Sequence, residues 1–133
     1  MTLQPTLVIA DDDPDHSNLL AAWLERRGYR VICFDSGDDL VGWAASRSSP
    51  RVDAFLLDLE MPGRDGLSSC RELRRMGGYT ETPALLVSGA RMDGIAEQAV
   101  DAGVTEIVRK DPEMLQNLNR WLDIYLPASR GGR

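Results

Sequence analysis

Short apolar runs alternate along this chain with stretches in which apolar residues recur at helical spacing. The runs are Leu7–Ala10, Val31–Phe34, Ala54–Leu57, Ala84–Val87 and a weaker one around Ile107 and Val108. Continuous apolar runs, as opposed to alternating ones, are typical of parallel strands that are covered on both faces. The pattern therefore predicts five strands of one parallel sheet.

The stretches between the runs have apolar residues three or four positions apart, which predicts helices. These helical patterns cover Leu19–Leu24, Leu40–Ala44, Leu67–Arg74, Ile95–Val100 and Met114–Tyr125. Gly28 and Gly103 are placed to end two of the helices. Asp13-Pro14 and Asp111-Pro112 each have the order expected of an N-cap followed by proline at the first helical position.

Strand and helix thus alternate five times, which predicts an α/β fold with a doubly wound parallel sheet, right-handed crossovers and helices on both faces. In such sheets the functional crevice lies outside the carboxyl ends of the strands. The residues that directly follow each strand are therefore the candidates for function.

Polar and charged residues follow four of the predicted strands. They are Asp11–Asp13 after the first strand, Asp58 after the third, Ser88 after the fourth and Lys110 after the fifth. Clustered carboxylates repel one another, and a divalent cation relieves that repulsion. Oxygen ligands without His or Cys favour Mg²⁺. Together with a hydroxyl and an ammonium group, this set predicts phosphoryl transfer to a carboxylate.

Each of these residues also has an ordinary structural interpretation. Asp13 fits a helix cap, and Asp58 could be an acidic residue at the start of a strand–helix loop. Ser88 is a common turn residue, and lysines such as Lys110 are usually solvated. The functional interpretation depends on their conjunction, because four separate strands bring complementary groups to one edge.

Composition and charge narrow the function classes. The chain has 133 residues, 43% hydrophobic and 27% charged, with a formal net charge of −6. This size predicts a single soluble domain with one core. The acidic balance argues against direct nucleic-acid binding and favours cations or a basic partner.

The cysteines and the amino terminus point to the cytoplasm. Cys33 and Cys70 belong to no CxxC motif, so we expect both to be small buried residues in a reducing compartment. The first residues contain neither the basic region of a signal peptide nor an apolar run long enough to cross a membrane.

From about Thr6 to Tyr125, the chain resembles the receiver domain of two-component response regulators. The matching segments are VIADDDP, LLDLEMPGRDGL, PALLVSGA and the lysine of IVRKD, and D-x-x-M-P-x-x-D-G over Asp58–Gly66 is the most specific of them. The resemblance implies a flavodoxin-like sheet with strand order 2-1-3-4-5. It also implies a receiver domain over residues 1–126, leaving 127–133 as a flexible tail or truncated linker.

The resemblance implies a role for each residue at the acidic edge. Asp58 matches the phosphoryl acceptor, which undergoes self-catalysed phosphorylation and dephosphorylation. Asp11, Asp12, Asp58 and the backbone carbonyl of Glu60 match the Mg²⁺ ligands, with Asp12 favoured over Asp11 as the direct one. The implied phosphoryl donor is a phosphohistidine on a histidine kinase or a histidine phosphotransfer protein.

The resemblance also implies a switch, at which this chain departs from the usual pattern. Ser88 and Lys110 match residues that contact the phosphoryl group. The position three residues before the lysine is often aromatic and is here Ile107, so aromatic gating is unavailable. Asp111 replaces the proline that usually follows the lysine, and its carboxylate could compete for Lys110. The only histidine, His16, is expected one turn into the first helix, near the acidic edge, with a surface role and not as a phosphorelay histidine.

Two alternatives remain open. One is a Mg²⁺-dependent phosphohydrolase of the haloacid dehalogenase type, since Asp11 and Asp13 have its D-x-D spacing. Against it, Asp15 stands where that motif has Thr or Val, and no cap domain is evident. The other is a degenerate receiver that acts only as a binding module, which the complete set of acidic, Ser and Lys residues disfavours. The sequence does not identify an output domain or effector. A stand-alone receiver and a receiver cut from a longer regulator or hybrid kinase are both open.

Overall fold

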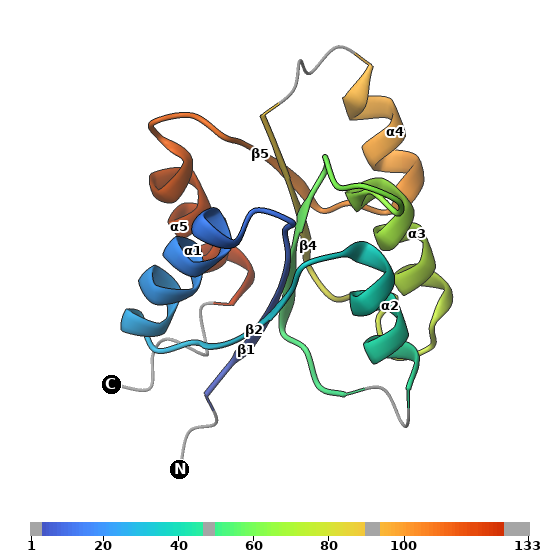
Figure 1. Ribbon diagram of the computed structural model, residues 1–133, viewed down its shortest axis with the longest axis horizontal. Coiled ribbons are helices and arrows are strands. Elements are labelled where there is room, and N and C mark those ends of the chain that lie inside the picture. Colours follow the sequence, from blue (N-terminus) through green and yellow to red (C-terminus); the bar gives the residue numbers. More distant parts are fainter. Residues whose placement is uncertain (1–3, 47–49, 90–93, 127–133) are drawn as a thin grey trace.

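The computed structural model describes residues 4–46, 50–89 and 94–126. Five parallel strands form one sheet in the order β2-β1-β3-β4-β5 (Figure 1). The strands are β1 (Thr6–Ala10), β2 (Arg30–Phe34), β3 (Ala54–Asp58), β4 (Ala84–Ser88) and β5 (Glu106–Arg109). The predicted tail at residues 127–133 lies outside the described residues.

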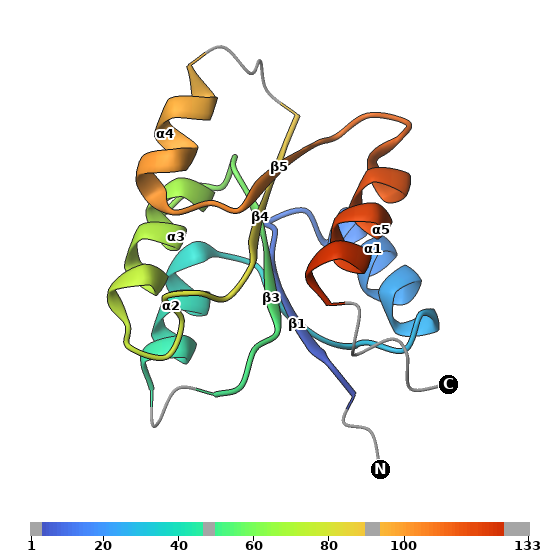
Figure 2. The ribbon, with the colours of Figure 1, turned by 180° about the vertical axis from the view of Figure 1, so that it is seen from behind.

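The helices lie on both faces of the sheet. They are α1 (Pro14–Arg26), α2 (Gly37–Ala45), α3 (Gly66–Arg75), α4 (Ile95–Ala102) and α5 (Met114–Tyr125). Helices α1 and α5 cover one face and α2, α3 and α4 the other, as Figures 1 and 2 show from opposite sides. The predicted α/β class, the five-stranded parallel sheet and the flavodoxin-like order 2-1-3-4-5 are confirmed.

Alternate side chains of each central strand enter two separate cores. In β1, Leu7 and Ile9 pack toward α1 and α5, whereas Val8 and Ala10 pack toward α2, α3 and α4. All residues of β1, β3 and β4 are buried. Each large aliphatic side chain buried in this way stabilises the fold by roughly 1.5–3 kcal/mol. The sheet is therefore a rigid support for whatever lies at its edge.

The expectation that both cysteines are buried is wrong for Cys33. Cys70 lies in the core, but Cys33 is exposed. The reason is topological, because β2 is an edge strand with no further strand beside it. Its burial pattern is mixed where those of the central strands are uniform. An apolar run therefore predicted this strand correctly without revealing its place at the edge of the sheet.

The helix ends were predicted with mixed success. Asp13 caps α1 as predicted, accepting the backbone N–H of Asp15 at 3.0 Å and that of His16 at 3.4 Å. Gly103 ends α4 in the left-handed conformation, at φ 86°. The predicted start of the last helix at Asp111-Pro112 is wrong, since α5 begins at Met114.

Asp111 and Pro112 instead form a turn that precedes α5. The Asp111 carboxylate accepts the backbone N–H of Glu113 at 2.9 Å, and its carbonyl accepts the N–H of Met114 at 3.0 Å. Aspartate side chains often stabilise turns through the amide two residues further on. The same residue type therefore produces a cap at Asp13 and a turn at Asp111.

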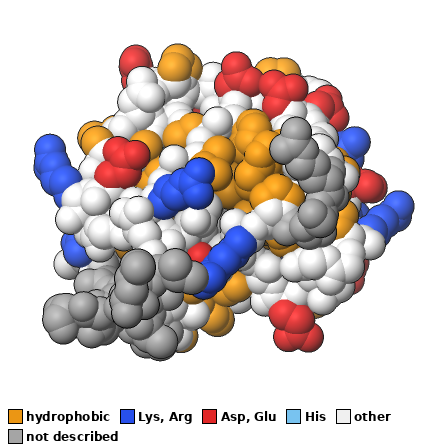
Figure 3. Space-filling model, turned by 90° about the horizontal axis from the view of Figure 1, so that it is seen from below, with side chains coloured by type: hydrophobic (Ala, Val, Ile, Leu, Met, Phe, Trp, Pro, Cys, Tyr) orange, Lys and Arg blue, Asp and Glu red, His pale blue; other side chains and the backbone are white. Residues whose placement is uncertain are grey.

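The side chains at the amino ends of the strands differ in type from the carboxylates at the carboxyl ends. Seen from this side, hydrophobic side chains gather at the centre with Arg side chains beside them (Figure 3). A cavity of about 320 Å³ near the starts of β1 and β2 is lined by Arg30, Arg51 and Trp43 among others.

Gly66, at the start of α3, packs directly against the end of β3. A Cβ added at Gly66 would lie 2.6 Å from the backbone oxygen of Asp58 and 2.7 Å from Leu86 Cδ1. We expect Gly66→Ala to lower the free energy of unfolding by about 1–3 kcal/mol, because backbone atoms must move to accommodate the methyl group. Urea unfolding measures this change.

Gly42 within α2 provides the matched control. Nothing lies within 4 Å of a Cβ added there. Gly42→Ala should therefore raise the free energy of unfolding by about 0.5–1 kcal/mol, the usual advantage of alanine over glycine inside a helix. Equal effects of the two substitutions would contradict the close packing assigned to Gly66.

Candidate functional site

Three carboxylates meet at the carboxyl ends of β1 and β3. Ala10 and Leu57 are paired in the sheet, so the next residues, Asp11 and Asp58, lie side by side. Oxygen atoms of Asp11, Asp12 and Asp58 all lie within 4.8 Å of one another. Asp11 and Asp58 are each only 3% exposed, while Asp12 is exposed to solvent. A group of oxygen donors with one side open to water fits a hydrated Mg²⁺ ion.

Contacts at both ends of the loop after β3 hold this loop in place. The backbone N–H of Leu59 donates to the carbonyl of Val87 at 2.8 Å, which continues the pairing with β4. Met61 is buried in the core, and Asp65 caps α3 by accepting the N–H of Ser68 at 2.8 Å. Asp58 therefore stands at the end of a fixed strand and not on a free loop.

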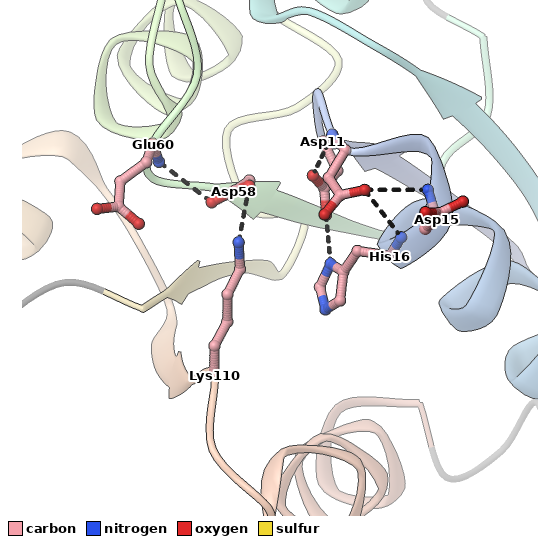
Figure 4. Close-up of polar contacts among 7 residues, drawn as sticks. Asp11, Asp15, His16, Asp58, Glu60 and Lys110 are labelled. Carbon is pink, nitrogen blue, oxygen red and sulfur yellow. Dashed lines mark hydrogen bonds and ion pairs between the residues drawn. The ribbon is translucent and has the colours of Figure 1, made fainter.

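Asp58 accepts two hydrogen bonds, one on each oxygen. Lys110 Nζ donates to Oδ2 at 2.9 Å, and the backbone N–H of Glu60 donates to Oδ1 at 3.1 Å (Figure 4). Burial raises the pKa of Asp58 above its ordinary value, although the bonds from Lys110 and Glu60 act in the opposite direction. The nearby Asp11 charge raises this pKa further.

Lys110 crosses the sheet to reach Asp58. It follows β5, its backbone N–H donates to the carbonyl of Ser88 at 2.8 Å, and its side chain spans β4 to reach the end of β3. Burial alone would lower the pKa of Lys110, but the hydrogen bond to Asp58 and the charges of Asp58, Asp11 and Glu60 raise it above its ordinary value. The ammonium group is therefore held in its charged form.

Asp11 has a partner that the sequence did not reveal. His16 Nδ1 lies 2.5 Å from Asp11 Oδ2 (Figure 4). The backbone N–H of Asp13 donates to Asp11 Oδ1 at 2.9 Å. The imidazole lies near the acidic edge as expected, but at 19% exposure it is more buried than a surface role implies. The available signal was that His16 lies three residues after the cap Asp13, in the helical turn nearest the acidic edge.

The predicted switch residues lie on neighbouring strands. Ser88 is fully buried at the end of β4, one step beyond Val87, which pairs with Asp58. Ile107 is half-buried in β5 and lines a cavity of about 270 Å³ that is bounded by α4 residues such as Ala99 and Val100. Their roles in switching stay predictions.

Two further carboxylates, those of Glu60 and Asp111, lie near Lys110 in the sequence or the structure but have different surroundings. Glu60 is exposed, and its charge contributes to the raised pKa of Lys110. A Cβ added at Gly89 would lie 3.7 Å from Glu60 Oε1 and 3.4 Å from Lys110 Cδ, so both side chains pass over this glycine. Asp111 is held by the amide of Glu113, whereas Lys110 is bonded to Asp58.

A sequence model described as the response regulator receiver domain matches residues 7–120. The chain belongs to this family. In the described part of the receiver domain, no helix has the length and apolar character needed to span a membrane.

Curated relatives include much longer proteins. The chain is 33% identical, over 78% of its length, to the cyclic di-GMP phosphodiesterase response regulator RpfG of Xanthomonas campestris. It is 32% identical, over 96% of its length, to the signal transduction histidine-protein kinase BarA of Escherichia coli. The chain spans only 27% and 13% of these two proteins. Receiver domains similar to this one are therefore found in both response regulators and kinases.

Solved structures include receivers of the same fold. The receiver domain of a sensor histidine kinase from Pseudomonas aeruginosa, solved with magnesium in its active site cleft, is 26% identical with a TM-score of 0.81. That similarity covers 94% of this chain and 99% of the other. A chemotaxis protein of Vibrio cholerae, CheY4, is 22% identical with a TM-score of 0.79, covering 89% and 98% respectively, and shows the shared fold.

The Lys110–Asp58 pair gives a testable stability difference. We expect Lys110→Met to lower the free energy of unfolding at about pH 7 by roughly 1–3 kcal/mol, because it leaves the buried Asp58 charge without its main donor. Because the pKa of Asp58 in the folded protein lies above its ordinary value, lowering the pH protonates Asp58 in the folded protein before it does so in the unfolded chain. A protonated Asp58 is neutral, so the cost of a buried charge without its donor disappears. The difference between variant and wild type should therefore shrink toward about pH 4.

Urea unfolding over this pH range measures the effect. Arg75→Met is the control, because Arg75 and Glu72 form an exposed surface pair at 3.5 Å. Such pairs contribute about 0.2–1 kcal/mol. A Lys110→Met penalty that is small or independent of pH would show that the pair does not offset the buried charge.

Proposed function

We propose that this domain accepts a phosphoryl group on Asp58 from the phosphohistidine of a histidine kinase or histidine phosphotransfer protein, with Mg²⁺ as cofactor. The observation that carries the proposal is the setting of Asp58. It is buried at a strand end, bonded to Lys110, and within 4.8 Å of the oxygens of Asp11 and Asp12. This combines a nucleophile, a candidate metal site and a charge clamp.

In the proposed step, one Asp58 oxygen forms a bond to phosphorus while the phosphorus–nitrogen bond to the partner imidazole breaks. The imidazole leaves with that electron pair and takes up a proton. Mg²⁺ held by Asp11, Asp12, Asp58 and the Glu60 carbonyl would supply positive charge against the phosphoryl oxygens. Dephosphorylation is a separate step, in which a water oxygen bonds to phosphorus while the bond between phosphorus and the Asp58 oxygen breaks, releasing inorganic phosphate and the Asp58 carboxylate.

The chain's own residues perform the rest. Lys110 donates a hydrogen bond to one Asp58 oxygen and would donate to a phosphoryl oxygen after phosphorylation, because its compact ammonium charge can change partners. The Ser88 hydroxyl would donate to another phosphoryl oxygen. These interactions exist only with the phosphoryl group present, so they shift the population toward a second conformation.

The readout we propose is partner binding at the face formed by α4, β5 and α5. Ile107 connects this face to the site, because it lies in β5, three residues before Lys110, and lines the cavity against α4. Because Ile107 is aliphatic, the proposed coupling takes place without an aromatic switch side chain.

Membership of the receiver family disfavours the phosphohydrolase alternative. The D-x-D spacing also has a structural explanation, since Asp11 is bonded to His16 and Asp13 caps α1. A degenerate receiver remains distinguishable by experiment, because it would bind a partner without accepting a phosphoryl group.

We expect Asp58→Asn to abolish phosphorylation by acetyl phosphate in the presence of Mg²⁺, because the amide cannot act as the nucleophile. Intact-protein mass spectrometry measures the added phosphoryl group. Asp101→Asn, an exposed acid on α4, is the control and should be labelled like the wild type. Undiminished labelling of Asp58→Asn would refute the acceptor assignment.

Beryllofluoride, which imitates the phosphoryl group, separates a working receiver from a degenerate one. With Mg²⁺ it should shift NMR signals of residues at the site and on the α4–β5–α5 face. A wild-type protein that shows neither labelling nor these shifts would be a binding module only.

Asp111→Ala tests whether the carboxylate after Lys110 competes with the phosphoryl group. Since Asp111 accepts the Glu113 amide and Lys110 is bonded to Asp58, we expect an unchanged phosphorylation rate. A time course with acetyl phosphate measures this rate. A faster reaction of the variant would show that Asp111 does withdraw Lys110.

A further inference from the structure

The two buried carboxylates of the site are held in the same way. Asp58 accepts the backbone N–H of the residue two places further on and a side-chain nitrogen, from Lys110. Asp11 likewise accepts the N–H of Asp13, two places further on, and a side-chain nitrogen, from His16. In both acids the backbone bond is on Oδ1 and the side-chain bond on Oδ2. His16 thus stands toward Asp11 as Lys110 stands toward Asp58.

His16 is itself fixed by the start of α1. Its backbone N–H points to Asp13 Oδ1 at 3.4 Å, and the next amide, of Ser17, donates to the Asp13 carbonyl at 2.9 Å. The imidazole is 19% exposed and Asp11 is 3% exposed. The contact between them is therefore largely shielded from solvent, which strengthens a hydrogen bond to a charged acceptor.

We propose that His16 is a positioning residue that holds the Asp11 carboxylate in the orientation needed for Mg²⁺ binding. This inference rests on the proposed function of the acidic site. A carboxylate has about four lone-pair positions, and the bonds from Asp13 and His16 occupy two of them. The remaining positions stay free for a cation or its bound water.

Fixing Asp11 in advance removes a cost from metal binding. Without His16, like-charge repulsion from Asp12 and Asp58 would turn the Asp11 side chain away from them. Binding of Mg²⁺ would then have to supply the free energy that orders this side chain. Hydrogen-bond partners of metal ligands typically contribute 10- to 100-fold to metal affinity. We expect His16→Ala to weaken Mg²⁺ binding by about this factor.

The substitution His16→Asn keeps a hydrogen-bond donor in place while removing the rest of the ring. The Asn side-chain nitrogen occupies nearly the place of imidazole Nδ1, so it can donate to Asp11 Oδ2. We expect His16→Asn to restore most of the affinity lost in His16→Ala. His16→Gln places its nitrogen one bond further out and should not restore it. Equal weakening by all three substitutions would overturn the positioning role.

Isothermal titration calorimetry with MgCl₂ on the full chain measures these dissociation constants. Asn18→Ala is the matched control, since Asn18 is exposed two residues further along α1. Urea unfolding of each variant confirms that it is folded. An unchanged Mg²⁺ dissociation constant in a folded His16→Ala variant would overturn the inference.

Asp12→Ala distinguishes failure of this inference from failure of the proposed function. If Asp12→Ala weakens Mg²⁺ binding and His16→Ala does not, the metal site stands and only the role of His16 is refuted. If neither substitution has an effect, the metal site itself is refuted and the inference fails with it. In an Asp11→Ala background, His16→Ala should have no additional effect, because the imidazole acts through Asp11.

His16 also provides a direct spectroscopic readout, because it is the only histidine in the chain. Its ring nitrogens therefore give a single set of NMR signals. We expect Nδ1 to carry a proton in the metal-free protein and to keep it when Mg²⁺ is added, with a change in chemical shift. A ring without a proton on Nδ1 in the Mg²⁺-bound protein would contradict donation to Asp11.

Discussion

Repulsion among three carboxylates confined to one edge of the sheet is the constraint on which this structure depends. Asp11, Asp12 and Asp58 lie within a few ångströms, and two of them are shielded from water. Charges in such a place need nearby donors or a cation. The fold supplies four such donors: one backbone amide in each of the loops after β1 and β3, His16 in the first turn of α1, and Lys110 after β5.

The donors come from well-packed elements, which explains how an acidic cluster coexists with a stable fold. The strands below the site are buried along their whole length, so Asp11 and Asp58 begin where a rigid support ends. Gly66 brings α3 into contact with the backbone of Asp58, and Asp13 fixes the start of α1. The side chains that face the carboxylates thus have little freedom, which is how binding sites gain precision from their scaffold.

The sequence was sufficient for the fold and for much of the site, and the reasons are physical. Asp58 and Lys110 are separated by 52 positions, yet each stands at or just past the end of a predicted strand, and parallel strands bring such positions to one edge. His16 was not predictable in this way, because its contact depends on the direction of a side chain on a helical turn. The predictions for Cys33 and Asp111 were wrong for related reasons. The local sequence does not show which strand lies at the edge of the sheet, nor whether an aspartate caps a helix or stabilises a turn.

The Lys110–Asp58 bond has a consequence for the integrity of the whole domain. It closes a loop that contains α3, β4, α4 and β5, although no covalent link joins its ends. Closing so long a loop has an entropic cost that the packing of the intervening elements must offset. The acidic edge therefore receives its ammonium group only when β4 and β5 are in place in the sheet. A molecule with β5 detached would keep Asp58 but lose the cation that faces it, so the charge balance at the acidic edge reports whether the last strand has joined the sheet.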